Sequence, residues 1–110
     1  MQLARTIYRL TAAYPGKERF GLASQMRRAA VSVPSNIAEG AARDSDNEFR
    51  HFLSIARSSL SELDTQIDLS YDLGFVPEQS RSELDELLTR VDRMLYALHR
   101  AKKVAVAKAG

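Results

Sequence analysis

The sequence predicts an all-α protein with the architecture of an antiparallel, up-down four-helix bundle. Apolar residues recur at steps of three and four along most of the 110-residue chain, the spacing of one face of an α-helix. Turn-forming residues interrupt this pattern around 15–16, 44–47 and 74–77, which leaves four helical segments joined by short loops. The chain has no cysteine, which excludes disulfide frameworks, thiolate zinc sites and cysteine nucleophiles.

One domain is expected over residues 1–110, because this length fits a single compact core. The predicted helices span 2–13, 20–42, 46–73 and 78–105, with a basic C-terminal tail that is expected to fray. The first helix has an apolar stripe made of Leu3, Ile7, Leu10 and Tyr14, and Arg9 interrupts any signal-peptide core. No apolar run is long enough to cross a bilayer, so the sequence predicts a soluble, cytoplasmic protein with no membrane partner.

The second helix contains a proline in its interior. The apolar spacing runs through Pro34 without a change of phase, at Leu22, Met26, Ala30, Val33, Ile37 and Ala41. An internal proline removes one backbone hydrogen bond and costs about 3 kcal/mol in an isolated helix. We therefore expect a helix that is kinked at Pro34 rather than ended there, with packing that compensates for the cost.

The third and fourth helices have the most regular apolar seams. Steps of four and three connect Phe49, Leu53, Ala56, Leu60, Leu63, Ile67, Ser70 and Gly74 in the third helix. The fourth helix repeats the pattern with Leu84, Leu88, Val91, Leu95 and Leu98. It can begin at Pro77, because proline is favoured in the first turn of a helix. Seams of this length predict an elongated bundle of nearly parallel helix axes.

Charge is small in sum, with a formal net charge of +2, but it is unevenly distributed along the chain. Residues 58–92 are predominantly acidic, whereas residues 93–110 have basic residues and no acid. In an antiparallel bundle the basic tail should lie near the turn at 44–48. There it would join a stripe of arginines spaced seven apart, Arg43, Arg50 and Arg57, with His51 beside them.

These cations predict a surface for phosphate contact, without reading of base identity. The candidate nucleic-acid-binding residues are Arg27, Arg28, Arg43, Arg50, Arg57, Arg93, Arg100, Lys102 and Lys103. The alternative interpretation is a solvated helix surface with intrahelical ion pairs, such as Glu39 with Arg43.

Catalytic patterns are weak. Glu48 and His51 have the Glu-x-x-His spacing of di-iron bundles, but a di-iron site needs a second such pair and two further glutamates. The chain has neither a glycine-rich phosphate loop nor a serine held on a strained turn. We therefore expect no catalytic residue, metal, cofactor or small-molecule substrate, and a metal-binding bundle enzyme is a remote alternative. A polar line along the second helix, formed by Ser32, Asn36, Glu39 and Arg43, predicts hydrogen bonds between packed helices.

Several segments resemble the four-helix bundle proteins encoded in intervening sequences of bacterial 23S ribosomal RNA genes. They are Arg27–Gly40, Glu48–Phe49, Phe52–Ala56, Ser59–Leu63 and Leu73–Phe75, and the resemblance covers about 6–100. Within them Pro34, Ser35, Asn36, Glu39 and Gly40 form a structural and assembly motif. The family includes the accessory variability protein of diversity-generating retroelements, a homopentameric barrel whose basic surface binds reverse transcriptase and nucleic acid. The resemblance therefore implies a homopentamer without catalytic residues.

Family members run longer before the segment that matches Ile7–Leu10, so we expect a short first helix and one less covered flank, or an incomplete chain start. The residues and the resemblance together predict a non-enzymatic, oligomeric protein that binds structured RNA through positive surface. The alternative is a protein-interaction scaffold or a reverse-transcriptase accessory subunit without RNA affinity of its own.

Overall fold

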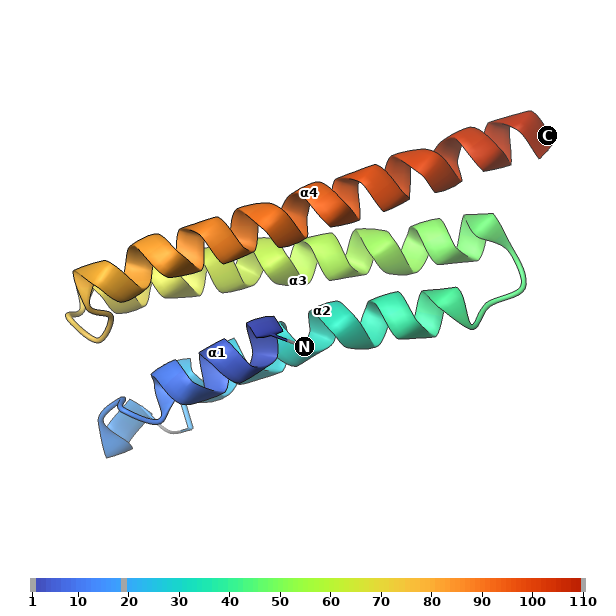
Figure 1. Ribbon diagram of the computed structural model, residues 1–110. Coiled ribbons are helices and arrows are strands. Elements are labelled where there is room, and N and C mark those ends of the chain that lie inside the picture. Colours follow the sequence, from blue (N-terminus) through green and yellow to red (C-terminus); the bar gives the residue numbers. More distant parts are fainter. Residues whose placement is uncertain (1, 19, 110) are drawn as a thin grey trace.

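The computed structural model describes residues 2–18 and 20–109, so the predicted domain limits at 1 and 110 lie outside the described residues. It contains α1 (Gln2–Thr11), a short 3-10 helix (Gly16–Glu18), α2 (Leu22–Ala41), α3 (Asp46–Asp72) and α4 (Glu78–Ala109). Successive α-helices alternate in direction along an elongated molecule (Figure 1). No strand occurs in the described residues, and the prediction of an all-α four-helix protein is confirmed.

The helix limits differ from the predicted ones by up to four residues. The first helix ends at Thr11 rather than 13, because the chain tightens there into short-range hydrogen bonds that lead to Pro15. The second begins at Leu22 rather than 20. The predicted basic tail is wrong as a separate segment, since α4 continues to Ala109. Lys102 ties this end of α4 to α3 through an ion pair with Asp46 at 3.0 Å.

Local sequence determines where the two longest helices begin and end. The Ser45 hydroxyl caps α3 by accepting a hydrogen bond from the Glu48 backbone N–H at 3.1 Å. At the other end, Gly74 has a φ of +83°, which places it in the left-handed region that favours glycine. Pro77 lies before α4, and its carbonyl accepts from the Arg81 N–H at 3.0 Å. It is thus a cap residue, and its predicted place in the first turn is wrong.

Helix α2 runs without interruption through Pro34, as the apolar phase predicted, whereas the kink stays a prediction. Farther along α2, Gly40 lies against the first turns of α3. A Cβ at Gly40 would come within 2.8 Å of the side chains of both Phe49 and Phe52. The glycine therefore permits the close approach of the two helices at this end of the bundle.

The core lies between α2, α3 and α4, and α1 covers one end of it. The α3 seam from Leu53 to Ser70 is buried as predicted, while Ala41 at the end of the α2 stripe is exposed, contrary to prediction. At the α1 end, the hydroxyls of Tyr14 and Ser70 donate to the Met26 sulfur at 3.5 and 3.3 Å. Hydrogen bonding allows these polar groups to stay inside an apolar core.

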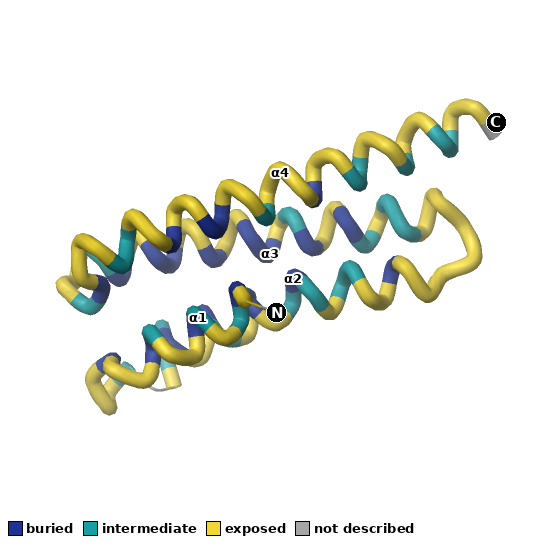
Figure 2. Tube along the Cα trace, viewed as in Figure 1, coloured by how far each residue is buried: buried dark blue, intermediate teal, exposed yellow. Residues whose placement is uncertain are grey.

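The ten-residue helix α1 spans only part of the bundle length. It packs against α2, whereas α2 packs on α3 and α3 on α4 (Figures 1 and 2). Beyond α1 an apolar groove of about 280 Å³ is lined by residues of α1, α2 and α4, among them Pro34 and Met94. The predicted less covered flank is therefore present. Across residues 2–18 and 20–109, no helix combines the length and the apolar character that a bilayer crossing needs.

Candidate nucleic-acid interface

Four contacts fix the register of α3 against α4. From the beginning of α3 toward the α3–α4 turn, the contacting pairs are Asp46–Lys102, Ser54–His99, Arg57–Tyr96 and Asp68–Arg81. The residue numbers rise on α3 as they fall on α4, so the two helices are antiparallel. The end of α4 thus lies beside the beginning of α3, as the charge pattern predicted.

One stretch of this α3–α4 seam is cationic. We call it the cationic face, and it consists of Arg50, Ser54, Arg57, Tyr96, His99 and Lys103. The Arg57 guanidinium carbon lies 5.3 Å from the Tyr96 ring centroid, and this ring is 50% exposed. Next to this pair, the Ser54 hydroxyl is 3.0 Å from His99 Nε2. The face therefore combines cations, hydrogen-bonding groups and an accessible aromatic ring.

The pKa of His99 reflects both burial of the imidazole and the positive charges of this face. Burial lowers the pKa of His99 below its usual value, and the nearby charges of Arg50, Arg57 and Lys103 lower it further. Cations act in this direction because they oppose a second positive charge on the ring. The three cations thus lie near enough to one imidazole to affect its pKa, and an anion bound on this face would relieve their mutual repulsion.

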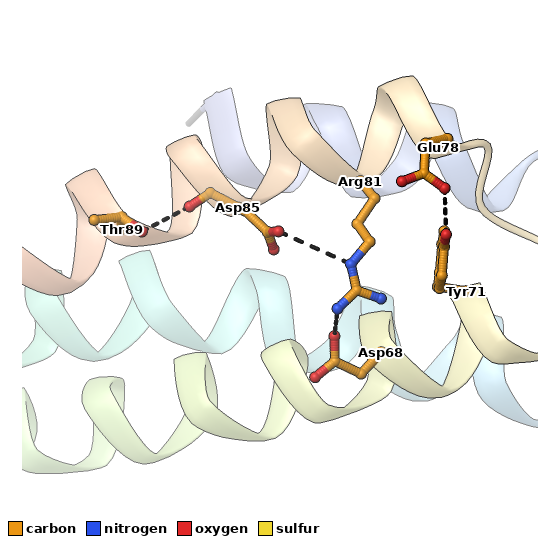
Figure 3. A network of polar contacts seen from close by, with 6 residues as sticks. All are labelled: Asp68, Tyr71, Glu78, Arg81, Asp85 and Thr89. Carbon is orange, nitrogen blue, oxygen red and sulfur yellow. Dashed lines mark hydrogen bonds and ion pairs between the residues drawn. The ribbon is translucent and has the colours of Figure 1, made fainter.

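The other stretch of the seam is acidic. We call it the acidic face, and it consists of Asp64, Asp68, Arg81, Asp85 and Asp92 with Tyr71 and Glu78 at its end. Figure 3 shows Arg81 reaching from α4 to Asp68 on α3, at 2.6 Å, with Asp85 of its own helix at 3.9 Å. The Tyr71 hydroxyl donates to Glu78 beside this cluster.

The two faces meet at Arg57. A groove of about 380 Å³ begins at Arg57 and continues along the seam past Asp64, Asp85 and Asp92. Burial raises the pKa of Asp64, and the charges of Asp68, Asp85 and Asp92 raise it further, while Arg81 opposes them. The potential therefore changes sign within a few turns of the same two helices.

Three of the predicted phosphate-binding residues contact other side chains of the same chain. Arg27 joins α2 to α1, because its Nε donates to the Thr11 hydroxyl at 2.7 Å and its guanidinium lies 4.6 Å from the Tyr8 ring centroid. Arg43 pairs with Glu39 and lies 5.0 Å from the Phe52 ring centroid. Lys102 pairs with Asp46, as described above. The structure therefore gives these three cations structural partners.

Of the remaining candidates, Arg28, Arg93, Arg100 and Lys103 are exposed, and Arg50 and Arg57 are half-buried. Arg93 and Arg100 lie three residues before and four after Tyr96, so they flank its side of α4. Arg28 lies elsewhere on the molecule. The hydroxyls of Ser32 on α2 and Ser59 on α3 are 2.8 Å apart, and Arg28 is one turn before Ser32, farther toward the acidic end of the seam. The structure thus places Arg50, Arg57 and Lys103 near His99, whereas Arg28 lies outside this region and Arg93 lines a groove with Asp85 and Glu86.

The Pro34 motif belongs to the helix interface rather than to this surface. Asn36 Nδ2 donates to the Ser32 hydroxyl at 2.9 Å, and Ser32 shares a hydrogen bond with the buried Ser59. The Ser32–Ser59 bond is one of the predicted hydrogen bonds between packed helices, whereas Asn36 with Ser32 and Arg43 with Glu39 pair four residues apart along the chain. Within the motif, Ser35 is exposed, and the assembly role of the motif stays a prediction.

The candidate metal pair does not extend into a cluster. His51 is exposed, and its ring packs edge-on against Phe52 at a centroid distance of 5.6 Å. In the part of the chain that the structure describes, no group of three or more His, Cys, Asp or Glu residues is arranged to hold a metal ion.

The sequence pattern did not identify the centre of the cationic face. We expected His51 beside the arginine stripe, and it lines a groove with Arg50 there, but the structure adds His99, Tyr96 and Ser54 to this surface. The register of α3 against α4 was the missing information. The acidic turn at 44–48 and the basic residues 100–103 gave the only signal, since their attraction fixes that register.

One comparison identifies the family of the chain. The sequence model of the family described as 23S rRNA-intervening sequence protein matches residues 1–97. Among curated proteins, none matches the sequence. Because the family match spans most of the 110 residues, the chain belongs to this family.

Proposed function

We propose that this member of the 23S rRNA-intervening sequence protein family is a non-enzymatic, oligomeric protein that binds structured RNA through its cationic face. The observation that carries the proposal is the contact of Arg57 with the exposed ring of Tyr96 across the α3–α4 seam, beside the Ser54–His99 hydrogen bond, on a face where the charges of Arg50 and Lys103 also act on His99. Cations held this close favour an anion, and the phosphates of RNA supply a row of them. A cytoplasmic location is part of the same proposal.

Salt dependence tests the proposal directly. Anisotropy of a labelled RNA hairpin should show affinity that falls steeply between about 50 and 200 mM salt, because phosphate neutralisation releases counterions. Replacing Arg50 and Arg57 together by Ala should flatten the log–log slope by about 1.5, the share of two phosphate contacts. The matched control removes two exposed arginines of α1, Arg5 and Arg9, and should leave the slope unchanged.

Three other outcomes contradict the proposal. Equal slopes for the two double variants would remove the cationic face from the interface. An intact oligomer without salt-sensitive RNA affinity would indicate a protein-interaction scaffold or a reverse-transcriptase accessory subunit instead. Iron retained on purification, and lost on changing Glu48 or His51, would indicate a metal enzyme.

We further propose that the chain assembles into a homopentamer, the number that the family resemblance implies. The support for self-association is the apolar groove beside α1, which leaves Val91 half-buried and Met94 47% exposed. Apolar surface in an open groove is stabilised when another subunit covers it. Light scattering should give the pentamer mass for the native protein and a smaller mass for Met94→Glu. A monomer mass for the native chain would overturn this proposal.

A further inference from the structure

Tyr96 differs in its surroundings from the other two tyrosines that contact an arginine. Three tyrosines in the described residues lie under an arginine, with the guanidinium carbon 4.6 Å from the ring centroid of Tyr8, 4.4 Å from that of Tyr71 and 5.3 Å from that of Tyr96. The first arginine also binds Thr11 of α1, and the second is paired with Asp68. The Tyr96 pair, formed with Arg57, lies on the cationic face, where Arg50 and Lys103 add further positive charge near His99.

Such a pair is the chemistry that binds an unpaired base. Aromatic rings and guanidinium planes both stack on nucleobases, and every base offers a face for stacking. Neighbouring cations hold the phosphates on either side of the base. Lys103 of the cationic face lies seven residues after Tyr96, and Arg100 lies four residues after it, on the same side of α4. The half-exposed ring thus lies beside the groups that would hold the backbone.

We propose that the cationic face binds an unpaired RNA base on the ring of Tyr96, so that the protein prefers single-stranded loops to continuous duplex. This inference rests on the proposed function and names the form of RNA that the face would take. In a duplex the bases are stacked on each other and cannot reach a protein ring, whereas loops present unstacked bases.

The length of the face supports the same choice. Arg50 and Arg57 are seven residues apart on α3, which is about 10 Å along the helix axis. One turn of a double helix is about three times as long, on the order of 30 Å. Beyond Arg57 the seam becomes acidic, at Asp64 and Asp92, and repels a phosphate backbone that continues along it. The face therefore fits a short, local feature of an RNA.

The experiment compares two labelled RNAs with equal numbers of phosphates, a hairpin with an unpaired loop and a blunt perfect duplex. The native oligomer should bind the hairpin about 10-fold tighter, within the range that stacking of one base supplies. Tyr96→Ala should remove this preference and leave the affinity for duplex unchanged. Tyr96→Phe should retain it, because phenylalanine keeps the stacking surface.

The matched control is Tyr8→Ala. Tyr8 is 47% exposed and also lies under an arginine, but it is on α1, outside the cationic face. This variant should keep the preference for the hairpin. Replacing one loop nucleotide after another by an abasic residue should reproduce the effect of Tyr96→Ala at one position. Light scattering and thermal unfolding on the same samples confirm that each variant keeps its fold.

Two results would overturn the inference while the proposed function stands. One is equal, salt-sensitive affinity of the native protein for hairpin and duplex. The other is a loss in Tyr96→Ala that is the same for both RNAs. If neither RNA binds with salt dependence, the proposed function fails and the inference fails with it. The salt series on the duplex alone distinguishes these cases.

Discussion

Arg57 and Arg81 both lie between α3 and α4, and each contacts a tyrosine ring, but their surroundings differ. Arg81 lies 2.6 Å from Asp68 and 3.9 Å from Asp85, so its charge is compensated within the acidic face. Arg57 lies on the cationic face, where it shares with Arg50 the effect on His99. Within residues 2–18 and 20–109, every ion pair of the structure involves Arg43, Arg81 or Lys102.

The comparison separates two uses of the same side chain. A cation among acids contributes to the fold, because it relieves the repulsion between carboxylates and holds two helices in register. A cation among other cations raises the local potential and is available to an external anion. The neighbours across the helix seam, rather than the arginine itself, decide between the two uses. Four variants or conditions test this distinction, here from the largest expected effect to the smallest.

Arg57 lies where the two faces meet, so reversing its charge should extend the acidic face into the cationic one. We expect Arg57→Glu to lower RNA affinity about 100-fold at low salt, because a phosphate contact is lost and a repulsive charge is added. Anisotropy with the RNA hairpin measures this change. Arg9→Glu on α1 makes the same charge change outside the seam and should have an effect of less than about 3-fold. A similar loss in both variants would show that only net charge matters.

Removing Arg81 should lower the stability of the protein, whereas removing Arg57 should not. Arg81→Ala leaves Asp68 and Asp85 without their cation and should lower the unfolding free energy by about 1 kcal/mol. For a domain of this size that is a fall in Tm of about 4–8 °C. Arg57→Ala removes a charge from a repulsive cluster and should leave Tm unchanged. Thermal unfolding followed by circular dichroism measures both, and an equal fall in the two variants would contradict the comparison.

RNA affinity should depend on pH through protonation of the His99 imidazole. Its folded pKa is lowered, so the unfolded chain binds protons more readily and the apo protein should lose stability as pH falls below about 6.5. Bound phosphate favours the imidazolium, so RNA affinity should rise about 3-fold between pH 7.5 and 5.5. Anisotropy across this range checks the prediction, and His99→Gln should make the profile flat. A rise that persists in this variant would assign the proton to another group.

The carboxyl of Asp64 should give the smallest effect. Its folded pKa is raised, mainly by burial, so stability falls as pH rises from about 3.8 through that pKa. Asp64→Asn removes this penalty and should stabilise the protein at pH 7 by no more than about 0.5 kcal/mol, since the side chain is exposed. Unfolding at pH 7 and pH 3 measures the difference, which should vanish at the lower pH. A variant that is less stable at pH 7 would contradict this sign.

Much of the fold could be predicted from the sequence. The seam of α3 from Leu53 to Ser70 is buried as its spacing indicated, and the continuity of α2 through Pro34 followed from the unbroken apolar phase. The errors fall at helix ends, where hydrogen bonds to caps and neighbouring helices decide the last turn. Pro77 caps α4 instead of entering it, and α4 runs four residues past its predicted end to Ala109.

The sequence predicted the positive charge of the candidate site, but not which side chains contact one another there. The arginines of α3 and the basic end of α4 were expected to meet, and the Asp46–Lys102 pair places them together. Apart from the Glu39–Arg43 pair, which the spacing indicated, the sequence did not show which of these cations have partners within the chain. Arg27 and Arg43 appear in the sequence as exposed basic residues, yet they contact the rings of Tyr8 and Phe52. Such contacts depend on which helix faces lie opposite each other.

The sequence by itself therefore determined the four amphipathic helices, the glycine turn at Gly74 and the separation of charge along the chain. These properties are local, because periodicity, capping and composition act within a few residues of each position. Tertiary structure alone decided that His99 and Tyr96 lie beside Ser54 and Arg57, since one turn of slippage between α3 and α4 would pair other residues. Packing of the two long seams fixes this register, and the register sets the chemistry of the cationic face.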